Sequence, residues 1–150
     1  MKNSLLFLLI YFFPSFYFYS ESLCFDGNAM AMPTERADSL HIKLARAKED
    51  KTKVLIYCDL MAEYIDNNLD TAFMFLNPAL QLAEKIRWDE GIARVKIEGG
   101  RLFWRKGSFE TALKYHNDAL AYFIKENNKD SIAEIITFIG QDYADWGKYQ

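Results

Sequence analysis

GGRLFWRKGSFETALKYHNDAL, residues 99–120, shares its pattern with segments 40 residues before and after it. Aligned residues at this spacing include Gly100 with Gly140, Gly107 with Gly147, Phe109 with Tyr149, Thr71 with Thr111, Ala72 with Ala112, Ala79 with Ala119, Leu80 with Leu120, Ile92 with Ile132, and Ala93 with Ala133. Repetition at a fixed period of this size is typical of stacked supersecondary units, none of which buries its apolar face alone. The sequence therefore predicts a repeat protein.

The apolar residues within each period have helical spacing. Intervals of three and four separate Ile132, Ile135, Ile136, Ile139 and Tyr143. We expect paired helices at about 51–66 and 70–87, at 90–106 and 109–126, and a further helix at 130–146, preceded by one at 35–48. Seven glycines and three prolines leave little turn material for strands. The predicted fold class is all-α.

Polar residues mark the expected helix ends. The N-cap candidates are Asp50, Asp89 and Asp130 for the first helices of the units, and Asn68 and Ser108 for the second helices. Gly107 and Gly147 are expected to form the turns between paired helices. Pro78 lies inside the predicted helix 70–87, where it removes a backbone hydrogen bond and predicts a kink.

With these features, the segment 99–120 resembles the centre of a tetratricopeptide repeat, whose pattern is W-x-x-L-G-x-x-Y and later A-x-x-x-F. Matching positions are Ile136, Ile139, Gly140 and Tyr143 in the third unit, and Gly100, Phe103 and Ala112 in the second. The departures are a period of 40 instead of about 34, polar residues at Lys96 and His116, and Leu60 and Glu63 in the first unit. The resemblance covers residues 51–150 and implies an alpha-alpha superhelix, a right-handed solenoid of helical hairpins that binds proteins or peptides.

The N-terminus is typical of an export signal. Lys2 precedes the apolar run Leu5–Tyr19, whose 15 residues reach only about 22 Å as a helix, less than a bilayer core of about 30 Å. We predict a signal peptide over 1–22, with an uncleaved membrane anchor as the alternative. An irregular linker over 23–34 and a repeat domain over 35–150 follow, with units at about 50–89, 90–129 and 130–150, the last truncated. The expected location is the periplasm or cell envelope.

Composition excludes several other classes. The chain is 51% hydrophobic and 26% charged, as in a packed globular protein, and its net charge of −3 is spread along the sequence. This distribution provides no basic patch for nucleic acid. Cys24 and Cys58 lack the spacing of a structural zinc site, and they are either unpaired thiols or a single disulfide formed after export.

No residue pattern predicts catalysis, a metal site or a cofactor. The two histidines, His41 and His116, have no nucleophile or ligand partner at a suitable spacing, and His116 falls at a repeat packing position. Gly99 and Gly100 lie inside a predicted helix and lack the Lys-Ser or Lys-Thr of a phosphate loop. We therefore expect a binding protein without enzymatic activity.

The best candidate surface is the helix 90–106, on which Arg94, Arg101 and Arg105 share one face. The resemblance implies a peptide-binding groove lined by Arg94, Ile97, Arg101, Trp104 and Arg105 and, from the first unit, by Tyr57, Met61 and Tyr64. Such a groove would favour an acidic or C-terminal peptide segment. The alternative is that the arginines form a solvated face, partly paired with Glu98, and that the aromatic residues are core.

The predicted helix 130–146 has apolar residues around much of its circumference, unlike the polar cap of a finished array. Further repeats or another subunit, including a second copy of the chain, are expected to cover it. The arrangement resembles the exported sensor region of bacterial histidine kinases and regulators that contain tetratricopeptide repeats. In that case any kinase activity belongs to a missing C-terminal part. The alternative is a free-standing exported scaffold that assembles envelope protein complexes.

Overall fold

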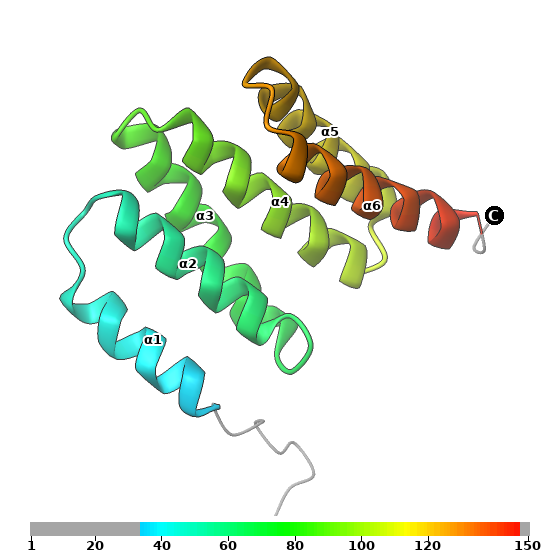
Figure 1. The fold of residues 1–150 in the computed structure, drawn as a ribbon. Helices are drawn as coiled ribbons and strands as arrows, with labels where there is room; N and C mark the ends of the chain where they lie inside the picture. Colours follow the sequence, from blue (N-terminus) through cyan, green and yellow to red (C-terminus); the bar gives the residue numbers. More distant parts are fainter. Residues whose placement is uncertain (1–33, 148–150) are drawn as a thin grey trace, which may run out of the picture.

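A computed structural model describes residues 34–147 of the chain. This part consists of six α-helices, contains no strand, and confirms the predicted all-α class (Figure 1). The helices are α1 (Glu35–Arg46), α2 (Lys51–Tyr64), α3 (Leu69–Lys85), α4 (Asp89–Arg105), α5 (Phe109–Lys125) and α6 (Lys129–Trp146). Each predicted helix begins and ends within two residues of these bounds. The predicted signal segment and Cys24 lie outside the described residues.

The helices pack in chain order, each against the next, and α2, α4 and α6 also contact one another in sequence (Figure 1). Among the described helices, α3 and α5 make no corresponding contact. The stack is therefore closer together on the side of α2, α4 and α6 than on the side of α3 and α5. We call the side formed by α2, α4 and α6 the inner side.

Small residues allow the paired helices to approach closely. The alanine pairs aligned by the 40-residue period, Ala72 with Ala112 and Ala79 with Ala119, are all fully buried. Larger side chains fill the space between the pairs, among them Leu60, Leu102 and Phe123. Since interiors pack at crystal-like density, equal residues at equal positions give the successive pairs similar interfaces.

Three of the connections between helices use the same turn. Arg87, Gly107 and Asn127 have positive φ angles of 53°, 78° and 53°, and they are spaced 20 residues apart. In each case the amide of the next residue donates to a carbonyl five positions earlier, as from Ser108 to Phe103 at 2.8 Å. This is the pattern of a Schellman motif, which ends a helix and reverses the chain. Gly147 differs, because its φ of −62° is right-handed.

The structure confirms some predicted caps and corrects others. The Asp50 carboxylate accepts from the amides of Thr52 and Lys53, and the Asn68 side chain accepts from Thr71. Ser108 is at the N-cap of α5 but its side chain makes no capping bond. The predictions for Asp89 and Asp130 were wrong. Trp88 and Asn128 are the N-caps, and the two aspartates lie in the first turns, where the helix dipole favours carboxylates. Helix α3 runs through Pro78 to Lys85 without a break.

Gly100 and Gly140 occupy equal positions in the period but have different surroundings. A Cβ added at Gly100 would lie 2.3 Å from the His116 ring, whereas one at Gly140 would meet no atom within 4 Å. The first glycine is therefore required by the contact between α4 and α5. The second has no neighbour that requires it in the described structure.

Alanine at these two positions should change stability in opposite directions. We expect Gly100→Ala to lower the free energy of unfolding by about 1–3 kcal/mol, because the His116 ring must shift in a packed core. Gly140→Ala should raise it by about 0.5–1 kcal/mol through its better helix propensity. Urea denaturation of the dilute proteins, followed by circular dichroism, measures both. Equal effects of the two substitutions would contradict this reading of the interface.

Candidate functional site

The inner side of the stack contains a hollow of about 440 Å³ between the end of α2, the last turns of α4 and the second half of α6. We call it the inner groove. Its lining residues are Ile65, Asp66, Arg101, Trp104, His116, Thr137, Phe138, Gln141 and Asp142. The residues from α6 are spaced at one, three and four positions, so the helical repeat places them on one face. The groove thus depends on the packing of three helices.

A buried polar pair forms part of the wall of the inner groove. Nδ1 of His116 on α5 lies 2.6 Å from Oδ2 of Asp142 on α6, and both side chains are about 1% exposed. The His116 ring also stacks on Phe138, with 5.4 Å between the ring centroids. Asp142 occupies the place that Leu102 has one period earlier, where the side chain is apolar and buried. Removing either partner would leave the other buried and unpaired, which is strongly destabilising.

Arg101 is fixed in the wall of the groove by two neighbours. Its Nη1 donates to Oε2 of Glu98 at 2.8 Å, and its guanidinium lies over the Phe138 ring, 5.6 Å from the centroid. About a third of the Arg101 side chain remains exposed. A guanidinium has five N–H donors, so the contact with Glu98 leaves donors for a ligand. The cation is held in position before a ligand arrives.

The other two arginines of the predicted basic face also have acidic partners. Arg94 pairs with Glu90 at 2.8 Å, and Arg105 pairs with Asp66 at 3.3 Å. The prediction that Glu98 would pair with Arg94 was wrong, because Glu98 turns toward Arg101. Since all three arginines are paired, an acidic ligand must compete with the protein's own carboxylates.

Burial changes the acidity of two groups near α4. Burial raises the pKa of the Glu98 carboxyl above its ordinary range, and Arg101 only partly offsets this effect. Burial also raises the pKa of the Cys58 thiol to about 12, with smaller contributions from Glu98 and Asp59. Because the thiolate is the reactive form, Cys58 is a poor nucleophile at neutral pH.

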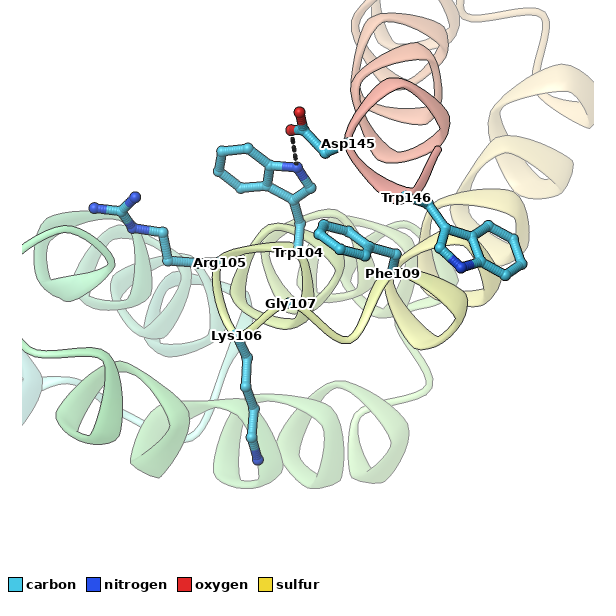
Figure 2. Close-up of a pocket in the computed structure, with 7 residues that line it drawn as sticks. All are labelled: Trp104, Arg105, Lys106, Gly107, Phe109, Asp145 and Trp146. Atoms are coloured by element: carbon cyan, nitrogen blue, oxygen red, sulfur yellow. Dashed lines mark hydrogen bonds between the residues drawn. The ribbon is translucent and has the colours of Figure 1, made fainter. Parts of the chain in front are cut away.

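Trp104 separates the inner groove from a second, more open hollow of about 670 Å³ at the ends of α4 and α6. Its indole N–H donates to Oδ2 of Asp145 at 2.9 Å, and Gln141 donates to the same oxygen at 2.7 Å. Figure 2 shows the rings of Phe109 and Trp146 beside Trp104 in this second hollow. Aromatic surface and hydrogen-bonding groups therefore lie together at this end of the molecule.

The structure brings together only part of the predicted groove. Arg101 and Trp104 line the inner groove, Arg105 lines the second hollow, and Arg94 lies nearer the start of α4. Met61 and Ile97 are buried in the core, at 0% and 7% exposure, so neither side chain is available to a ligand.

The two tyrosines predicted for the first unit pack within the protein. The Tyr64 hydroxyl lies 2.9 Å from Nε2 of His41, and Tyr57 stacks on Phe75 with 6.1 Å between the ring centroids. Sequence reasoning missed the residues that α6 contributes, Thr137, Phe138 and Gln141. The period could have identified two of them, because Gln141 is aligned with Arg101 and Thr137 with Ile97.

No protein-family model, curated protein or solved structure matches this chain. Within residues 34–147, no group of three or more His, Cys, Asp and Glu side chains is arranged to hold a metal ion. None of the helices in this part of the chain has the length and apolar character needed to span a membrane. The candidate site is therefore described by its own geometry.

Glu98 should make stability depend on pH. Since its pKa is raised in the folded protein, the folded state holds the proton to higher pH than the unfolded state does. The free energy of unfolding is therefore expected to fall as pH rises from about 4.3, the ordinary glutamate value, through the raised pKa. Glu98→Gln should remove this dependence, so that the variant gains stability relative to the wild type as pH increases.

Urea denaturation of both proteins between about pH 4 and pH 8 measures this difference. Glu110→Gln, which alters an exposed carboxylate on α5 outside the groove, is the matched control. A difference between wild type and Glu98→Gln that stays constant with pH would contradict the prediction.

Proposed function

We propose that this chain is a peptide-binding module of the tetratricopeptide type, a right-handed solenoid of helical hairpins that holds an extended segment of another protein in the inner groove. The observation that carries the proposal is the placement of Arg101, Trp104 and Phe138 in one hollow by α4 and α6. Its volume of about 440 Å³ lies within the range of about 300–1,000 Å³ typical of ligand pockets. The stacked helix pairs and the 40-residue period support the same reading.

The lining of the groove suggests the chemistry of its ligand. Ile65, Trp104 and Phe138 provide apolar surface for an aromatic or aliphatic side chain. Arg101 offers N–H donors beside this surface, to which a carboxylate of the ligand would bind in competition with Glu98. Gln141 and Thr137 have exposed side chains that can hydrogen-bond an extended backbone. The proposed ligand is an acidic peptide segment, or a peptide C-terminus, with an adjacent large apolar residue.

The setting that we propose is the exported sensory part of a larger bacterial signalling protein. The apolar run Leu5–Tyr19 after Lys2 supports export, and binding through a groove without chemistry suits a sensor that passes a signal to another domain. The alternative is a free-standing exported scaffold for envelope complexes. In a longer form of the protein, an apolar run of about 20 residues followed by heptads would favour the sensor.

The groove can be tested with peptides selected from a random phage-displayed library on the purified chain. We expect the selected peptides to combine acidic and large apolar residues, and to bind in fluorescence anisotropy. The double variant Arg101→Glu and Arg105→Glu should weaken binding at least about tenfold, since charge attraction becomes repulsion. Thr137→Trp, a change at an exposed position in the groove wall, should also weaken binding by filling the space.

The matched control is the double variant Lys114→Glu and Lys125→Glu, which changes the net charge equally at exposed positions on α5. Its affinity should stay near that of the wild type. If the groove variants bind as tightly as this control, the inner groove is not the binding site.

A further inference from the structure

One face of α6 is apolar and uncovered in the described structure. It consists of Ile132, Ala133, Ile136, Gly140, Tyr143 and Ala144, and we call it the outer α6 face. Ile136 and Tyr143 are 55% and 58% exposed. None of the six residues is charged, although surfaces of soluble proteins normally interrupt apolar patches with charges. This face lies apart from the inner groove, whose α6 residues are Thr137, Phe138, Gln141 and Asp142.

The equal positions on α4 show what such a face does. There α5 covers them. Tyr115 packs on Phe103 with 5.0 Å between ring centroids, the His116 ring lies against Gly100, and Lys96 pairs with Asp118 at 2.7 Å. On α6, the aligned residues are Tyr143, Gly140 and Ile136. The outer α6 face therefore repeats a helix-binding surface, with isoleucine in place of the lysine that forms an ion pair.

We propose that the partner of this face is the same face of a second copy of the chain. The face has a ridge of large residues, Ile132, Ile136 and Tyr143, beside a stripe of small ones, Ala133, Gly140 and Ala144. A two-fold axis that runs along α6 brings the ridge of each copy opposite the small stripe of its partner, because this rotation exchanges the two sides of the face. Ridges packed into grooves are the usual basis of helix contacts.

The other end of the stack is a poor match for the outer α6 face. Helix α1 exposes charged residues, Glu35, Arg36, Asp38, Lys43 and Arg46. Packing α1 of one copy on α6 of another would bury these charges against an uncharged surface, which costs free energy that nothing there offsets. A symmetric contact between two α6 helices avoids this burial and forms a closed dimer.

Sedimentation equilibrium of the full 150-residue chain over a range of concentrations tests the proposal. We expect a monomer–dimer equilibrium, with a limiting mass of twice 17.5 kDa. Ile136→Glu should raise the dimer dissociation constant at least about tenfold, because it places a charge in an apolar contact. Ile124→Glu is the matched control. Ile124 on α5 is 58% exposed but lies outside the face, and its replacement should leave the dissociation constant unchanged.

Gly140→Leu provides a second variant that tests the contact by shape alone. Its side chain extends into open space in a single copy, so the thermal unfolding midpoint should not fall. In the dimer it would occupy the place of the partner's ridge, and the variant should be monomeric at concentrations at which the wild type dimerises. A wild type that stays monomeric overturns the proposal. Assembly that survives both Ile136→Glu and Gly140→Leu, for example through residues 5–19, overturns it as well.

Discussion

The His116 ring links three helices, and the second half of the structure depends on its position. Its edge lies against the backbone of α4 at Gly100, its Nδ1 is held by Asp142 of α6, and its face stacks on Phe138. Because glycine at position 100 allows the approach and the carboxylate fixes the ring, α4 and α6 are set at a defined separation. That separation creates the inner groove between Arg101 and Phe138. A polar pair therefore does here what an aliphatic contact does in the preceding unit.

The 40-residue period and the spacing of apolar residues were sufficient to predict the helices, because both follow from local geometry and repeated packing. Sequence spacing could not select ion-pair partners, since Glu90 and Glu98 are equally far from Arg94 along α4. Tertiary packing decides between them, because Glu98 turns inward toward Arg101. The N-caps were misassigned for a related reason. Asp89 and Asp130 are good capping residues, but the shared turn begins α4 and α6 one or two residues earlier.

The candidate site was predicted less well than the fold. A helical face can be derived from sequence, but not which side of that face lies against a neighbouring helix, so Ile97 and Met61 were assigned to a groove although they are core. Arg101 and Trp104 were placed correctly because they lie near the end of α4, where the neighbouring helices leave space. The contribution of Phe138 depends on its contacts with His116 and Arg101, which come from other helices and leave no local signal.

The left-handed residues at 87, 107 and 127 define a module of 20 residues, one helix and one reversal of the chain. Such a module determines how the protein can change in length. Insertion or loss of a single module would exchange inner and outer helices for everything beyond it, whereas a change by two modules leaves every later interface as it was. Duplication in steps of 40 residues can therefore lengthen the binding surface without new packing solutions. Evolution of this chain is free in repeat number and constrained in repeat size.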